Sequence, residues 1–163
     1  MHYSLGLPGA PVWPVVSIVG ALGQDLVGQD LAGQDPRSRS LTDRLALLHR
    51  RKRRAVRIVD VNCRDGAMLI HAAREARKLG FLSIECLGVD EDAELIDDAR
   101  DRAHLVTDSA IGLDFEVAAP LARLQAEADF PADIVLYREA PGLSQAFRDA
   151  LRRAGDVALG GTS

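Results

Sequence analysis

Two aspartates stand where buried β-branched segments give way to turns, and both could bind a ligand through their carboxylates. Asp60 lies in the segment Val56–Val61, and Asp90 follows the segment Ser83–Val89. A carboxylate at the end of a strand can accept two hydrogen bonds from a sugar diol. A structural alternative also exists, in which Asp90 stabilises the N-terminus of the following helix and Asp60 caps a turn. The sequence leaves both interpretations open.

The turn that follows Asp60 is the second feature with a chemical use. It runs from Asn62 to Gly66, and a glycine there lets the backbone adopt positive φ and approach a ligand closely. Asn62 also tolerates the left-handed conformation, whereas Arg64 adds bulk and charge. Cys63 could act as a nucleophile, but no histidine lies near it in the sequence, which favours a small loop residue. The turn is therefore a predicted site of backbone contact with a ligand.

Other kinds of site find no support in the residue spacing. The histidines lack the spacing of metal ligands; they are His2, His49, His71 and His104. Cys63 and Cys86 are too few and too far apart for a zinc site or a disulfide framework. The sequence also lacks a Ser/His/Asp order and a phosphate-binding loop. We therefore expect no metal site and a reducing, cytoplasmic environment.

Segments with strand and helix patterns alternate along the chain and would position these residues. The predicted strands are residues 56–61, 83–89, 113–117, 133–137 and 156–159. A first predicted helix is capped by Ser40, and the others cover residues 68–79, 95–103, 121–128 and 141–154. Such alternation implies right-handed crossovers and a parallel sheet. Ligands of these sheets bind beyond the carboxyl ends of the strands, which here are residues 60–66, 90–92, 117–120 and 137–139.

The stretch from Ile58 to Gly66 resembles the first motif of the class I S-adenosylmethionine-dependent methyltransferases, in which a strand is followed by Asp-x-Gly-x-Gly-x-Gly. Gly88-Val89-Asp90 is similar to the second strand of this family, whose terminal acid binds the ribose hydroxyls, and residues 132–137 are similar to its fourth strand. The resemblance implies an α/β fold, namely a Rossmann-like three-layer sandwich with a mostly parallel five-stranded sheet in the order 3-2-1-4-5. This sheet is truncated relative to the seven strands of the family.

The resemblance also implies a function and a binding site. The chain would use S-adenosylmethionine as its cofactor and transfer a methyl group to an unidentified acceptor, with catalytic residues that are not identified. Asp90 would bind the ribose, and Asp60 would help to hold the loop and the methionine ammonium. The implied cofactor-binding residues are Asp60, Asn62, Cys63, Gly66, Asp90, Glu91 and Tyr137. Methyl transfer from a sulfonium needs chiefly in-line positioning, so it does not require an evident acid/base pair.

Departures from the family pattern favour an alternative, a catalytically inactive methyltransferase-like domain with a binding or regulatory role. Asn62 and Arg64 stand where the family has glycine, and Ala118–Pro120 stand where it has an acid that meets the adenine amino group. The last two strands of the family are also missing. A nicotinamide-dependent oxidoreductase is less favoured, because residues 62–67 lack the Gly-x-Gly-x-x-Gly turn.

The 163 residues suit one domain preceded by a less regular segment. Residues 1–40 are predicted to form a flexible N-terminal arm, because glycine and proline interrupt them and no periodic pattern persists. The motif Gly-Gln-Asp recurs in this arm and is interpreted as a low-complexity linker; its copies are residues 23–25, 28–30 and 33–35. Residues 41–163 are predicted to form the methyltransferase-type domain.

The net charge of −4 argues against general affinity for nucleic acids. The charges are unevenly placed, because an acidic run covers residues 90–101 and a basic run consists of Arg50, Arg51, Lys52, Arg53 and Arg54. The two runs are interpreted as solvated faces that complement each other, with a phosphate or RNA contact at the basic run as the alternative.

No membrane contact is expected, because the apolar stretch 10–22 is short and contains two prolines. The incomplete sheet edge after the fifth strand could be covered by a second subunit, which would give a homo-oligomer, or by the N-terminal arm.

Overall fold

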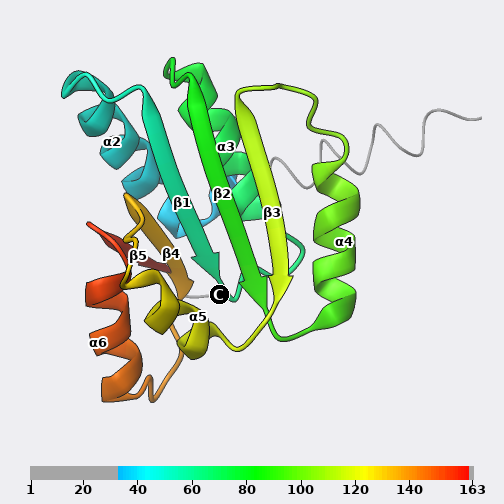
Figure 1. Cartoon of the computed structure of the whole chain (residues 1–163), viewed down its shortest axis with the longest axis vertical. Helices are drawn as coiled ribbons and strands as arrows, with labels where there is room; N and C mark the ends of the chain where they lie inside the picture. The colour runs from blue at the N-terminus through cyan, green and yellow to red at the C-terminus, as the bar shows by residue number, and fades with distance from the viewer. Residues whose placement is uncertain (1–32, 162–163) are drawn as a thin grey trace, which may run out of the picture.

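Five parallel strands form one sheet in the order β3-β2-β1-β4-β5 (Figure 1). The computed structural model describes residues 33–161. The strands are β1 (Ala55–Val61), β2 (Ser83–Asp90), β3 (Ile111–Val117), β4 (Ile134–Arg138) and β5 (Ala158–Gly161). The helices are α2 (Pro36–Arg50), α3 (Ala67–Lys78), α4 (Ala93–Ala103), α5 (Pro120–Glu127) and α6 (Gln145–Ala154). The predicted fold class and strand order are confirmed.

Apolar cores lie on both faces of the sheet and produce the three predicted layers. Side chains alternate between the two faces along a strand. Ile58 of β1 belongs to the core shared with α2, α3 and α4, whereas Val59 and Val61 belong to the core shared with α5 and α6. All three side chains are fully buried, as expected for a central strand with helices on both faces.

The part of the sheet formed by β2 and β3 has one solvated face. Along most of these strands exposed residues alternate with less exposed ones, which is the pattern of strands covered on one side. Ile84 and Phe115 are buried on the side of α3 and α4, while Glu85 and Asp114 are exposed on the other side. α5 has eight residues and packs against α6 (Figure 1); on this face it contacts β2 toward the carboxyl end, where Val89 joins the core of α5 and α6.

The first helix begins earlier than predicted. α2 starts at Pro36 with Asp35 as its N-cap, so the prediction that Ser40 caps this helix is wrong. The Asp35 side chain accepts a hydrogen bond from the backbone N–H of Arg37, and proline suits the first helical position. The end of the predicted arm is therefore helical, and the last Gly-Gln-Asp copy supplies a helix cap. The rest of the arm, residues 1–32, lies outside the described residues.

The last helix begins later than predicted. α6 starts at Gln145 and not at Pro141, because Ser144 is the residue that caps it. The Ser144 hydroxyl accepts a hydrogen bond of 3.1 Å from the backbone N–H of Phe147. β5 is also displaced toward the C-terminus and begins at Ala158.

Phe115 packs against two glycines and so holds the loop between β1 and α3 close to β2. A Cβ atom at Gly88 would lie 2.5 Å from the Phe115 ring, and one at Gly66 would lie 2.7 Å from it. Neither position accepts a larger residue without displacement of the ring. Gly66 also has a φ of 70°, a conformation that favours glycine. Both space and backbone conformation therefore require a glycine at position 66.

Candidate functional site

The carboxyl ends of four neighbouring strands lie side by side at one edge of the sheet. Val61 of β1 pairs with Val89 of β2 and with Tyr137 of β4. Asp90 at the end of β2 pairs with Val117 at the end of β3. The strand ends therefore converge as the sequence predicts, and the predicted binding residues gather at this carboxyl edge.

The loop between β1 and α3 has a left-handed backbone at every second residue. The φ angles are 60° at Asn62, 54° at Arg64 and 70° at Gly66. These are the three positions at which the methyltransferase family carries glycine. Asparagine often adopts this conformation, whereas an arginine in it costs about 1 to 2 kcal/mol. The loop thus follows a backbone path that suits glycine, although two of the three residues are not glycine.

Replacing Arg64 by glycine is expected to raise the free energy of unfolding by about 0.5 to 1 kcal/mol. Relief of the left-handed strain favours the variant by about 1 to 2 kcal/mol, and the greater freedom of glycine in the unfolded chain opposes it by about 0.4 to 1 kcal/mol. Arg39→Gly is the matched control, because Arg39 is exposed within α2, where glycine costs about 1 kcal/mol. Chemical denaturation measures both, and a destabilised Arg64→Gly variant would contradict the left-handed strain.

Asp90 fixes this loop to the end of β2. Its Oδ2 accepts a hydrogen bond of 2.9 Å from the backbone N–H of Arg64, and its Oδ1 accepts one of 3.1 Å from the N–H of Asp92. Asp92, not Asp90, caps α4, because it accepts hydrogen bonds from the N–H groups of Glu94 and Leu95. Each carboxylate oxygen has a further lone pair. Asp90 is half-buried and can therefore still accept hydrogen bonds from a ligand.

Asp60 is fully buried near the end of β1. Its Oδ1 lies 3.3 Å from Nη1 of Arg37, while its Oδ2 has no hydrogen-bond donor in the part of the chain that the structure describes. Burial raises the pKa of Asp60 to about 6 because it disfavours the charged form, and the positive charges of Arg37 and Arg138 act in the opposite direction. A buried carboxylate with an unused oxygen is a candidate for contact with a positively charged ligand group.

Arg37 lies across the carboxyl ends of β1, β4 and β5. Its Nη1 also donates to the carbonyl oxygen of Tyr137 at 3.4 Å, and its stem lies against Gly161, where an added Cβ would be 2.6 Å from Arg37 Cγ. Its Nη2 pairs with Asp35 at 2.8 Å. Arg37 falls within residues 1–40, which the sequence predicts to be a flexible arm, so this role is not predicted. The sequence Asp35-Pro36, a common helix start, is the signal that could have revealed it.

The side chain of Cys63 is a part of the core. It is 3% exposed, and a Cβ atom at Gly88 would lie 3.0 Å from its Sγ. Burial and the nearby charges of Asp60 and Asp90 raise the pKa of the thiol far above its usual range, so it is not activated as a nucleophile. The Cys63 backbone N–H bonds to the carbonyl oxygen of Val89 at 3.0 Å. A contact between the cofactor and the backbone of Cys63 stays a prediction.

Tyr137 and Glu91 lie at the margins of the carboxyl edge. The Tyr137 side chain is half-buried and lies toward β5, since a Cβ atom at Gly160 would be 2.6 Å from its hydroxyl oxygen. Glu91 is exposed in the short loop between β2 and α4. The binding roles of these two residues stay predictions.

The loop after β3 presents no acidic side chain between residues 118 and 120. Ala118 donates its N–H to the carbonyl oxygen of Asp90 at 3.0 Å, so this loop lies beside the end of β2. α5 then begins at Pro120, with Ala119 as an N-cap that offers no side-chain hydrogen bond. The place where the family presents an acid to adenine therefore offers backbone groups and small apolar side chains.

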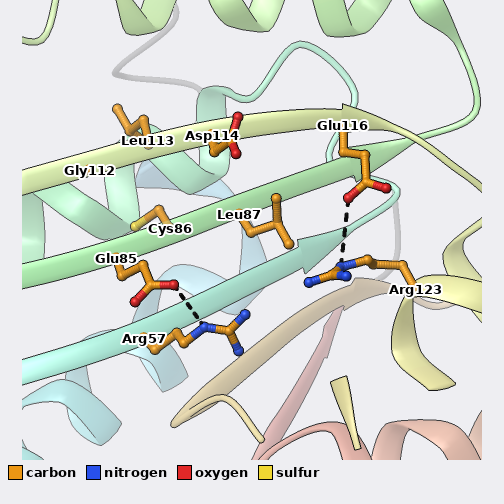
Figure 2. A pocket seen from close by; sticks show the side chains of 9 residues that line it. All are labelled: Arg57, Glu85, Cys86, Leu87, Gly112, Leu113, Asp114, Glu116 and Arg123. Carbon is orange, nitrogen blue, oxygen red and sulfur yellow. Dashed lines mark hydrogen bonds and ion pairs between the residues drawn. The ribbon is translucent and has the colours of Figure 1, made fainter. Parts of the chain in front are cut away.

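A hollow of about 380 Å³ lies away from the carboxyl edge, on the solvated face of β2 and β3 (Figure 2). Arg57 Nε pairs there with Glu85 at 3.0 Å, and Arg123 Nε lies 3.8 Å from Glu116. Figure 2 shows that both arginines point toward these acids. None of the predicted site residues lines this hollow, and its arginines are already paired, so it is not part of the candidate site.

The basic run lies at the opposite edge of the sheet, between the end of α2 and the start of β1. Lys52 has a φ of 65°, and the next N–H, of Arg53, bonds to the carbonyl oxygen of Leu48 at 3.2 Å; this is the Schellman type of helix end. Arg53 pairs with Asp133 at 2.8 Å. Within residues 33–161 no ion pair joins the basic run to the acidic run. The proposed complementarity therefore does not involve direct pairing, and a phosphate contact stays a prediction.

The described helices include none that is both long enough and apolar enough to cross a membrane. Between residues 33 and 161, no group of three or more His, Cys, Asp or Glu side chains is placed to hold a metal ion. At the carboxyl edge the carboxylate of Asp90 is half-buried, whereas that of Asp60 is fully buried.

The fold is that of S-adenosylmethionine-dependent methyltransferases. A structure from Plasmodium falciparum, proposed to be a protein-L-isoaspartate O-methyltransferase and containing S-adenosyl-L-homocysteine, is similar with a TM-score of 0.50 and 15% identity, over 70% of this chain and 52% of that chain. Magnesium protoporphyrin IX methyltransferase from Synechocystis, with S-adenosylmethionine bound, has a TM-score of 0.47 and 14% identity, over 91% of this chain and 62% of that one. The chain thus spans between half and two thirds of these proteins. No protein-family model and no curated protein sequence matches it.

Proposed function

We propose that the chain binds S-adenosylmethionine at the carboxyl edge of β1 and β2 and transfers its methyl group to an acceptor. The observation that carries this proposal is the left-handed backbone at Asn62, Arg64 and Gly66, in the loop that follows Asp60 and is bonded to the carboxylate of Asp90. This path resembles that of a glycine-rich nucleoside-binding loop, although two glycines are absent. The S-adenosylhomocysteine in the similar Plasmodium structure supports the same class of ligand.

The residues present fit the two polar ends of such a cofactor. Asp90 has lone pairs left for the two ribose hydroxyls. Asp60 has an unused Oδ2 for the ammonium of the methionine portion. When bound, the cofactor would supply a methyl group on a positively charged sulfur. A lone pair of the acceptor would attack the methyl carbon in line with the C–S bond, and this bond would break to leave S-adenosylhomocysteine. The acceptor loses its proton to solvent or to a base that the acceptor itself brings.

A second candidate function is binding or regulation without catalysis. It is favoured by the Arg37 guanidinium, which already pairs with Asp60, and by the lack of an acid between residues 118 and 120. In this case the carboxyl edge keeps the fold of the family without its ligand.

Calorimetric titration with S-adenosylmethionine and S-adenosylhomocysteine separates the two functions. We expect dissociation constants in the micromolar range, about −8 kcal/mol of binding free energy, and no binding of NADH in the same buffer. Absence of heat at millimolar concentrations of both sulfur ligands would favour the non-catalytic function. Heat from NADH alone would instead point to an oxidoreductase.

A further inference from the structure

The contact between Arg37 and Asp60 lies inside the candidate site and is shielded from water. Arg37 is 2% exposed and Asp60 is 0% exposed. The contact joins one guanidinium nitrogen to Oδ1 at 3.3 Å, and Oδ2 has no donor among residues 33–161. The two oxygens of Asp60 are therefore unequal, since one is held by α2 and the other is buried without a donor.

The charged groups that face Asp60 come from three parts of the chain. Arg37 belongs to α2, Arg138 belongs to β4, and Asp35 precedes α2; the two arginines favour the ionised carboxylate, and Asp35 opposes it. The nearby thiols are uncharged, because burial raises their pKa values well above the usual range; they belong to Cys63 and Cys86. Arg37 makes a hydrogen bond to Asp60 through Nη1.

We propose that Arg37 is a positioning residue for the cofactor: it holds Asp60 through Oδ1 and so keeps Oδ2 free to accept a hydrogen bond from the cofactor ammonium. The inference rests on the proposed function and assigns a role to a residue outside the motifs of the family. Arg37 itself need not touch the ligand.

A buried aspartate can lose its ability to accept a hydrogen bond from a ligand in two ways. Its terminal torsion is broad and roughly two-fold, so without a fixed partner either oxygen can turn away from the ligand. Burial also favours the neutral acid, whose O–H donates a hydrogen bond instead of accepting one. The Arg37 guanidinium opposes both changes, because it binds one oxygen and stabilises the negative charge.

A purely structural role for Arg37 would be to attach α2 to the sheet, and the two roles differ in what they predict. A structural role changes the free energy of unfolding and leaves ligand affinity at a given pH unchanged in any variant that folds. A positioning role makes the ligand affinity follow the ionisation of Asp60.

The test follows the ¹³C carboxyl resonance of Asp60 by NMR in the ligand-free protein, and the affinity for S-adenosylhomocysteine, both as functions of pH. Arg37→Met keeps the stem over Gly161 and removes the charge; we expect the Asp60 midpoint to rise by about one pH unit or more and the affinity at pH 7 to fall about tenfold. Arg37→Lys should recover most of both. Asp35→Asn, which keeps a good N-cap, should move the Asp60 midpoint downward, because it removes a neighbouring negative charge.

Parallel movement of the NMR midpoint and the midpoint of ligand affinity supports the positioning role. An affinity that stays unchanged while the Asp60 midpoint moves would overturn it and leave Arg37 a structural residue. Should Arg37→Met not fold, Arg37→Lys and Asp35→Asn allow the same comparison. Failure of the unsubstituted chain to bind the ligand would overturn the proposed function, and the NMR titration would still show whether Arg37 controls Asp60.

Discussion

Asp60→Asn is expected to become more stable, relative to the unsubstituted chain, as the pH rises. The difference between their free energies of unfolding should favour the variant by about 3 kcal/mol more at pH 7 than below pH 4. The pKa of Asp60 is raised from 3.8 to about 6 in the folded state, and a change of this size corresponds to about 3 kcal/mol. The stability that protonation contributes is fully present below pH 3.8 and is lost as the pH rises through about 6. Asparagine does not titrate, so it avoids this loss.

The measurement is urea denaturation of both proteins between pH 3 and pH 8, at constant ionic strength. Asp98→Asn is the matched control, because Asp98 is an exposed residue of α4 and makes the same change of charge without burial. Its difference from the unsubstituted chain should stay nearly constant with pH. A pH-independent effect of Asp60→Asn would show that the buried carboxylate keeps an ordinary pKa and would contradict the electrostatic description of the site.

Asp90→Asn is expected to weaken S-adenosylhomocysteine binding by about 10- to 100-fold. The variant loses the negative charge and one of the two acceptor oxygens, and a hydrogen bond to a charged group contributes about 1.5 to 3 kcal/mol. Its remaining oxygen can still accept from one of the two backbone N–H groups that Asp90 holds, those of Arg64 and Asp92. Calorimetry measures the affinity, and circular dichroism checks the fold.

A 2′-deoxy analogue of S-adenosylhomocysteine separates ribose contact from loop distortion. In the unsubstituted chain the analogue should bind more weakly than the parent ligand, whereas in Asp90→Asn the two should bind alike, since the group that discriminates them is gone. If Asp90→Asn weakens both ligands by the same factor, the carboxylate acts through the loop and not on the ribose. Asp98→Asn should change neither affinity.

The regular parts of the fold were predictable because local and tertiary preferences agree in them. The run from Val56 to Val61 is β-branched and also central in the sheet, so propensity and burial favour the same state. Strand order followed from the alternation of strands and helices and from the family resemblance. The starts of α2 and α6 were missed for a local reason. Asp35 lies in a repeat that resembles a linker, and Ser144 follows Pro141, which itself suits a first helical turn.

The candidate site was predictable in position and less so in detail. Strand ends fix where Asp60 and Asp90 lie, but their partners depend on tertiary contacts. The partner of Asp60 is Arg37, which lies 23 residues earlier, and no pattern in the sequence connects the two. The left-handed conformation of Arg64 opposes its local preference and is held by the bond from its N–H to Asp90. The sequence therefore predicts the two carboxylates that accept hydrogen bonds, and it does not predict the groups that hold them.

The basic run and the acidic loop after β2 lie at opposite edges of the sheet, so the local charge differs between these two places although the net charge is small. Cations gather before β1, while exposed acids begin beyond the end of β2 and continue along α4. An anionic surface approached by diffusion would attract the cationic end and leave the candidate site facing the solvent. The acidic end would at the same time attract small cations, such as a sulfonium compound, toward the edge where Asp60 and Asp90 lie.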